Sequence, residues 1–175
     1  MPLFNFVKQL ILANQISFEE GEIKLLGQNM AMSPLSFYST LLTELRKAQP
    51  EKYSDIIYAV AKESSSRHSK AVKEKFKMGA RKQTEFDLNT LALAGLGKGE
   101  LIEFDAVNKK ALVKVTDSHI AKALHPSDAA VDFLIAGFLA GSAASAFAAE
   151  NIECREIKCR AKGDAFCLFR IFMKE

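Results

Sequence analysis

The chain has 175 residues, of which 49% are hydrophobic and 26% are charged, and its formal net charge is +3. This length suits one domain with a sizeable core, and the composition excludes a disordered chain. The small net charge, with basic residues scattered along the sequence, gives no indication of direct binding to nucleic acid.

Residues 1–32 are expected to form a helix and a hairpin that extend from the core. The first residues lack the basic segment of a secretory signal, which favours a cytoplasmic protein. Apolar residues at helical spacing lie within residues 5–14, and residues 15–32 resemble two strands around a turn at Gly21. Residues 33–175 then form the core of a single domain.

Two helices are predicted in the first part of this core. Ser33 and Pro34 open the first one, because Ser can cap free N–H groups and Pro suits the first turn. Apolar spacing carries this helix to about Ala48. The second helix covers residues 51–76, and its polar segment, residues 63–70, is a solvated face, a kink or an exposed loop, of which the solvated face is favoured.

The middle of the chain predicts a helix, a hairpin and the start of another helix. Residues 84–87 fit an N-terminal cap for a helix that begins near Leu88. Residues 100–105 and 110–116 alternate apolar and polar side chains, as the two strands of a hairpin do. Residues 125–128 are then expected to start an Ala-rich helix.

That Ala-rich segment, residues 129–149, has Asp132 as its only charged residue. It is long enough to cross a bilayer. However, it consists largely of Ala, Gly and Ser, and a charged residue inside a span costs about 2.5–3.5 kcal/mol. We therefore expect a buried helix and no membrane span.

The last predicted hairpin, residues 151–172, holds all three cysteines of the chain. A turn at Gly163 brings Cys159 close to Cys167, and two thiolates with the Glu156 carboxylate could bind Zn²⁺. Strand alternation opposes this site, because Cys159 should face away from Glu156 unless a bulge or the turn re-aims it. The alternative is that the cysteines are small buried hydrophobic residues.

Taken together, these elements indicate an α+β fold in which helices pack on a mostly antiparallel sheet. The two C-terminal hairpins could share that sheet. The sequence contains no Gly-x-Ser-x-Gly or His-Glu-x-x-His motif and no convincing Cys–His pair, so a binding module is favoured over an enzyme.

A signature near the C-terminus is made of Glu156, Cys159, Gly163, Asp164, Cys167 and Phe169. It resembles the terminal signature of the 4-vinyl reductase-like family, also described as hydrocarbon-binding domains. In phenol-sensing members the Glu and the two Cys resemble zinc ligands, and a fourth ligand, a Cys, stands five residues before a Gly-aromatic-x-x-Gly run. Here Asp132 stands at that place, which departs from the family pattern. The resemblance implies a structural zinc held by Asp132, Glu156, Cys159 and Cys167, with Cys154 as an alternative ligand.

The resemblance also implies a fold similar to that of haem–NO-binding domains and trafficking-complex subunits, a homodimer, and a hydrophobic, aromatic or acyl ligand. The side chains expected to line the pocket are Phe37, Tyr38, Leu41, Phe86, Leu91, Phe133 and Phe138, unless they form a dense core. We therefore predict a small-molecule binding or sensor domain with a structural zinc site. The alternatives are a reductase or accessory factor acting on a tetrapyrrole vinyl group, implied by the family name, and a scaffold module.

Overall fold

Helices and antiparallel sheets alternate along the chain in the computed structural model, which describes residues 3–175. The helices are α1 (Leu3–Leu12), α2 (Leu35–Ala48), α3 (Tyr53–Phe76), α4 (Ala80–Leu93), α5 (His119–Ala123) and α6 (Phe133–Phe147), with a short 3₁₀ helix, η1 (Arg160–Lys162). The strands are β1 (Ile16–Glu19), β2 (Glu22–Leu25), β3 (Gln28–Met30), β4 (Lys98–Asp105), β5 (Lys110–Thr116), β6 (Ile152–Lys158) and β7 (Cys167–Met173). The predicted α+β fold class is confirmed.

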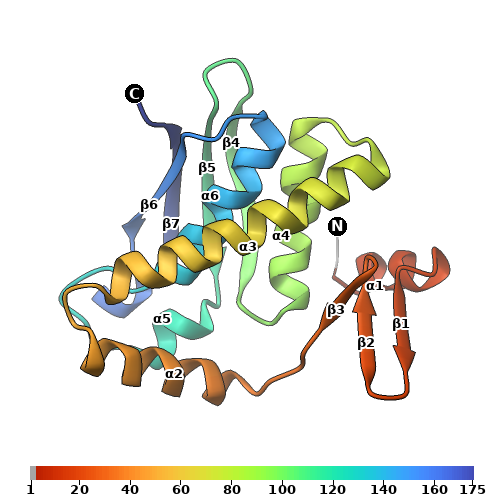
Figure 1. Ribbon diagram of the computed structural model, residues 1–175. Helices are drawn as coiled ribbons and strands as arrows, with labels where there is room; N and C mark the ends of the chain where they lie inside the picture. The colour runs from red at the N-terminus through yellow and green to blue at the C-terminus, as the bar shows by residue number, and fades with distance from the viewer. Residues whose placement is uncertain (1–2) are drawn as a thin grey trace.

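The main sheet has four antiparallel strands in the order β4-β5-β7-β6, so both predicted C-terminal hairpins do share one sheet (Figure 1). Side chains alternate between its two faces. On the inner face, Val113 and Val115 of β5 and Phe169 of β7 are fully buried and belong to the largest apolar cluster. The neighbouring residues on the same strands point to the outer face and are half-buried or exposed.

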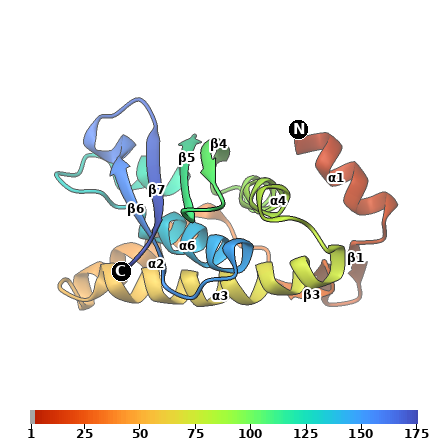
Figure 2. The ribbon, with the colours of Figure 1, turned by 90° about the horizontal axis from the view of Figure 1, so that it is seen from above.

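Two helical layers cover the inner face of the sheet, with α6 next to the strands and α3 beyond it (Figure 2). Glycines let α3 and α6 approach closely. A Cβ atom at Gly137 would lie 2.4 Å from the carbonyl oxygen of Tyr58, and one at Gly141 would lie 2.1 Å from that of Lys62. This close contact explains why the apolar segment predicted from sequence is a buried helix.

The N-terminal arm, residues 3–30, forms a separate small sheet with the order β1-β2-β3. Sequence alone predicted two strands here, and the structure adds a third because Leu26 and Gly27 adopt positive φ and turn the chain again. Phe6 and Leu10 of α1 pack with Leu25 in a small second apolar cluster that also includes residues of α3 and α4. The arm thus has a small core of its own.

Two predicted helix starts are wrong. The cap expected at residues 84–87 lies inside α4, which begins at Ala80 after Gly79. The helix expected to start at residues 125–128 begins only at Phe133, because Asp132 is its N-cap and accepts a hydrogen bond from the Ile135 N–H.

Two details of the first helices also differ from expectation. Pro34 rather than Ser33 is the N-cap residue of α2, and no side chain among residues 3–175 caps that end. The polar segment 63–70 does not interrupt α3. Ser65 and Ser69 are buried there, while Arg67 and Lys70 are exposed, so this segment is only partly a solvated face.

Helix α3 also reaches the edge strand β6. The Tyr58 hydroxyl donates to Glu153 Oε2 at 2.6 Å and accepts from the Cys154 N–H at 3.0 Å, and Lys62 Nζ donates to Glu153 Oε1 at 3.0 Å. These bonds hold α3 across one margin of the sheet. No helix within residues 3–175 combines the length and the apolar character that a membrane span requires.

Candidate functional site

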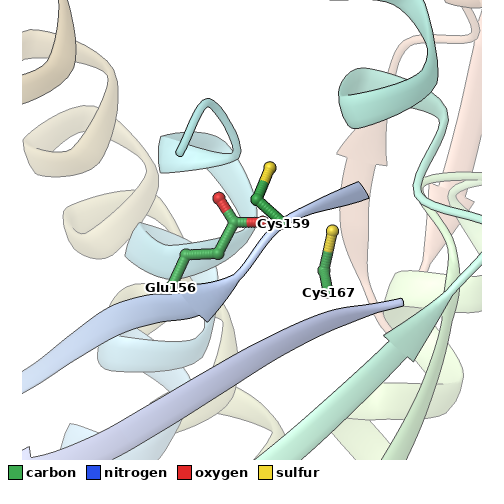
Figure 3. Close-up of side chains that lie close together, drawn as sticks. All are labelled: Glu156, Cys159 and Cys167. Carbon is green, nitrogen blue, oxygen red and sulfur yellow. The ribbon is translucent and has the colours of Figure 1, made fainter. Parts of the chain in front are cut away.

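Three predicted metal ligands converge at one end of the β6–β7 hairpin. One ligand atom each of Glu156, Cys159 and Cys167 lies within 4.8 Å of the other two (Figure 3). Zinc bonds of about 2.0–2.3 Å in a tetrahedral shell place neighbouring ligand atoms about 3.3–3.8 Å apart, so small side-chain adjustments would complete such a shell. The three side chains come from the end of β6, the loop after it and the start of β7.

A β-bulge produces this convergence. The pairing of β6 with β7 shifts register between Glu156 and Lys158, and this irregularity changes the direction of the side chains that follow. Cys159 then lies beyond the strand, where it precedes η1. The objection from simple strand alternation therefore does not hold for this hairpin.

Local hydrogen bonds fix the two cysteines. Asp164 Oδ2 accepts from the Cys159 N–H at 2.8 Å, and the Arg160 N–H points to Cys167 Sγ at 3.4 Å. Gly163 has a φ of +99°, a conformation that favours glycine, and it lets the chain turn back towards β7. The Gly-Asp pair of the signature is therefore the structural support of the two sulfur atoms.

The electrostatics of the cluster suit a cation. Burial raises the pKa of the Cys159 and Cys167 thiols, and the negative charge of Glu156 raises both further. Glu156 Oε1 is buried and has no hydrogen-bond partner within residues 3–175. A divalent cation would offset the charge of two thiolates and a carboxylate and would give this oxygen a partner. The donor set therefore fits zinc.

Asp132 and Cys154, the two candidates for a fourth ligand, lie outside the group of three. The Asp132 carboxylate accepts from the Ser118 hydroxyl and the Ile135 N–H, while its own N–H donates to Glu156 Oε2 at 3.0 Å. Burial raises the pKa of Asp132 to about 7. Cys154 is buried in the main apolar cluster, two residues before Glu156 on the same strand.

The seven residues predicted to line a pocket do not meet in one place. Leu91 and Phe138 belong to the main cluster, Phe86 to the cluster of the N-terminal arm, and Tyr38 and Phe133 to a third cluster beside α2 and α5. The remaining two, Phe37 and Leu41, are at least half exposed. A single cavity with this lining is absent from the described part of the chain.

An open cleft of about 1200 Å³ lies between α1 on one side and α4 and β4 on the other. Its apolar lining includes Phe6 and Leu10 of α1 and Phe86 and Leu88 of α4. Phe86 is the only predicted pocket residue that lines it. The cleft is therefore a feature of the N-terminal arm rather than of the main core.

Sequence reasoning missed a buried polar cluster where α3, α4 and α6 meet. Asp87 Oδ2 accepts from the hydroxyls of Ser69, at 2.8 Å, and Ser142. Gln83 Nε2 donates to the Ser69 carbonyl at 2.8 Å and to Ser145 Oγ at 3.0 Å. The signal that could have revealed this cluster is the coincidence of polar residues on the inner faces of three otherwise packed helices.

Two acceptor atoms of this cluster are unsatisfied. Gln83 Oε1 and Asp87 Oδ1 are buried and find no hydrogen-bond partner in the part of the chain that the structure describes. Burial raises the pKa of Asp87 to about 6, although its bonds from Ser142 and Ser69 act in the opposite direction. Unpaired buried acceptors are costly, so their presence in a core calls for an explanation in terms of function.

Comparison with known families supports the resemblance seen in the C-terminal signature. The domain model of the vinyl-4-reductase family matches residues 112–172, which contain most of β5, all of α6 and the whole metal cluster. This match confirms the family resemblance predicted from sequence. A search of curated protein sequences found no match to the chain.

Three solved structures share the fold. The phenol-responsive sensory domain of the transcription activator PoxR, solved with phenol, has a TM-score of 0.85 and 16% identity and covers 98% of this chain and 90% of that one. A vinyl-4-reductase family protein from Methanocaldococcus jannaschii has a TM-score of 0.59 and 18% identity, covering 83% and 85%. Subunit 3 of a trafficking protein particle complex from Naegleria fowleri, covalently bound to palmitic acid, has a TM-score of 0.52 and 10% identity, covering 79% and 94%.

Proposed function

We propose that the chain is a small-molecule-sensing domain, that it binds its ligand beside Gln83 and Asp87, and that zinc at the β6–β7 hairpin stabilises it. The observation that carries the proposal is the pair of buried, unpartnered acceptors, Gln83 Oε1 and Asp87 Oδ1, between three helices of the described chain. The match to the vinyl-4-reductase domain and the fold shared with a phenol-responsive sensory domain support the same reading.

The ligand class follows from the chemistry of this cluster. Both free atoms are acceptors, so the ligand must offer a hydrogen-bond donor such as a hydroxyl group. The surrounding core is apolar, with Leu91 one helical turn after Asp87 and fully buried, so the rest of the ligand must be apolar too. A phenol combines these two properties. Its entry requires a displacement of α4, because side chains of α3, α4 and α6 meet at this point.

Phenol binding is tested by thermal unfolding and calorimetry of the whole chain, with toluene as the matched compound that lacks the hydroxyl. We expect phenol to raise the unfolding temperature and toluene to bind at least about tenfold more weakly, which corresponds to about 1.4 kcal/mol for the lost hydrogen bond. Gln83→Leu and Asp87→Leu should remove this difference between the two compounds.

The control for these variants is Ser65→Ala. It deletes a hydrogen bond of similar kind, from Ser65 Oγ to the Phe138 carbonyl at 2.7 Å, in the same helical layer but outside the Gln83–Asp87 cluster. It should retain the preference for phenol. If phenol does not bind, or binds equally well to both Leu variants, the ligand site is not at this cluster.

The zinc proposal rests on Glu156, Cys159 and Cys167. We expect elemental analysis to find about one zinc ion per chain, and Cys159→Ser or Cys167→Ser to lose it, because each removes one of the two thiolates. Cys154→Ala should keep the metal, since Cys154 lies outside the three-residue group. Zinc content in Asp132→Asn then decides whether Asp132 is the fourth ligand. A metal-free wild-type protein would contradict the proposal.

We also propose a homodimer that forms through the N-terminal arm. The apolar residues of α1 point in two directions. Phe6 and Leu10 are buried within the chain, while Phe4 and Leu12 are 77% and 75% exposed, as is Phe18 of β1 at 73%. A helix that is apolar on nearly all sides normally requires cover on all sides, and a second copy would provide it.

A further inference from the structure

Basic side chains gather on the outer face of the main sheet, opposite the face that α6 covers. Arg155 and Lys158 of β6, Arg170 of β7 and Lys114 of β5 lie on three adjacent strands. They alternate with the buried inner-face residues of the same strands, which fixes their outward direction. Residues that are far apart in the sequence therefore form one positive surface, here called the basic sheet face (Figure 1).

At the centre of the basic sheet face, two arginines stand opposite each other. Arg155 of β6 and Arg170 of β7 are direct cross-strand partners, and both are exposed. Within residues 3–175, neither forms an ion pair with a carboxylate. Like charges directly opposite each other in a sheet are destabilising, so this pair is better matched to an external anion than to the isolated chain.

The basic sheet face also has an apolar component. Leu112 is the cross-strand partner of Arg170, and Leu168 is paired with Lys114 on one side and Lys158 on the other. Both leucines are half-buried on the outer face. Arginines and apolar side chains on one flat surface are the composition typical of a protein–protein interface.

Its aromatic rings do not suit nucleic acid. Lys114 Nζ and Lys158 Nζ lie 4.9 and 5.4 Å from the centre of the Phe166 ring, and the Arg155 guanidinium lies 5.4 Å from that of Phe172. Since base stacking on a sheet requires a free ring face, these cation contacts compete with it. The neighbouring strand β4 also presents Glu100, Glu103 and Asp105, which would repel a phosphate backbone.

We propose that the basic sheet face binds an acidic polypeptide segment of a partner protein. Carboxylates of the partner would pair with Arg155 and Arg170, for which a bidentate geometry is available, and apolar side chains between them would contact Leu112 and Leu168. Residues two apart along an extended segment are about 6.6–6.8 Å apart, which matches the spacing of side chains on one face of the sheet. The partner segment therefore carries Asp or Glu at alternate positions.

The test uses a short fluorescein-labelled peptide with Glu at alternate positions and Leu or Ser between them, and fluorescence anisotropy with the full chain. We expect Arg155→Gln/Arg170→Gln to weaken binding at least about tenfold, a loss of about 1.4 kcal/mol. The matched control, Lys52→Gln/Lys70→Gln, removes the same charge from exposed positions in and next to α3 and should bind like the wild type.

A second variant separates binding from folding. Arg155→Glu places a carboxylate opposite Arg170, so it should raise the unfolding temperature while it abolishes peptide binding. The proposal is overturned if the wild type does not bind the acidic peptide, if the double Gln variant binds it as well as the wild type, or if a Lys-for-Glu peptide binds equally. Tighter binding of a thymidine oligonucleotide, or of vesicles with anionic lipid, would overturn it as well and assign this face to a different partner.

Discussion

Asp87 is a carboxyl group that the core must keep largely protonated or pair with a ligand. Its side chain is almost fully buried, and burial raises its pKa from 3.8 to about 6. The hydroxyls of Ser69 and Ser142 stabilise one carboxyl oxygen, and the other has no partner among the described residues. Because the folded chain holds this proton more tightly than the unfolded chain does, ionisation of Asp87 opposes folding.

This shift predicts a pH dependence of stability. The contribution of Asp87 is unchanged below about pH 4, and the free energy of unfolding should then fall as the pH rises to about 6, by on the order of 2–3 kcal/mol in total. Asp87→Asn cannot ionise, so its loss of stability over this interval should be smaller. Denaturant unfolding of both proteins at several pH values measures the difference. Parallel curves for the two proteins would contradict it.

At the residue scale, sequence predicted the metal cluster better than the polar cluster. Glu156, Cys159 and Cys167 belong to one short signature, so their proximity required only a hairpin. Gln83 and Asp87 depend on serines of α3 and α6 that are distant in the sequence. Local reading assigned Asp87 to a helix cap, because Asp is common there and the inner faces of helices cannot be paired without tertiary information.

At the scale of elements, the packing of α3 on α6 depends on two glycines. Gly141→Ala should destabilise the chain by about 1–3 kcal/mol, because the new methyl group would meet backbone atoms of α3, which outweighs the gain of up to about 1 kcal/mol in helix propensity. The control is Gly79→Ala, since a Cβ atom there meets nothing within 4 Å among the described residues. Chemical denaturation measures both. Equal stabilities of the two variants would show that α6 can shift without cost.

Most elements were predictable because their periodicity is local, while their ends were not. The hairpin of β4 and β5 alternates clearly and was found. The start of α6 was placed too early, because residues 125–128 resemble a cap while Asp132 supplies the real one. The convergence of Cys159 with Glu156 required a bulge, which strand alternation alone does not encode.

On the scale of the whole molecule, zinc should act as a clamp on the end of the chain. The Glu156 carboxylate also accepts from the Asp132 N–H, so the cluster joins the last hairpin to the start of α6. Removal of the metal with a chelator should therefore lower the unfolding temperature by about 10 °C, equivalent to several kcal/mol. Calorimetric scans of wild type and Cys159→Ser should show an effect of the chelator on the wild type only.

The proposed dimer gives a second prediction at this scale. Phe4→Asp/Leu12→Asp places two charges on the exposed side of α1 and should convert a dimer into a monomer in light-scattering measurements. Val107→Asp is the control, because Val107 is 88% exposed in the turn between β4 and β5 and should leave the mass unchanged. A wild-type chain that is already monomeric at high concentration would refute this interface.

The contact of Tyr58 with β6 has a consequence for aggregation. An edge strand offers unpaired N–H and C=O groups that can recruit strands from other molecules. Here the Tyr58 hydroxyl occupies the Cys154 N–H, and the paired charges of Lys62 and Glu153 stand beside it. The same helix that closes the core therefore also discourages fibril-like growth from this margin, which keeps the sheet at four strands.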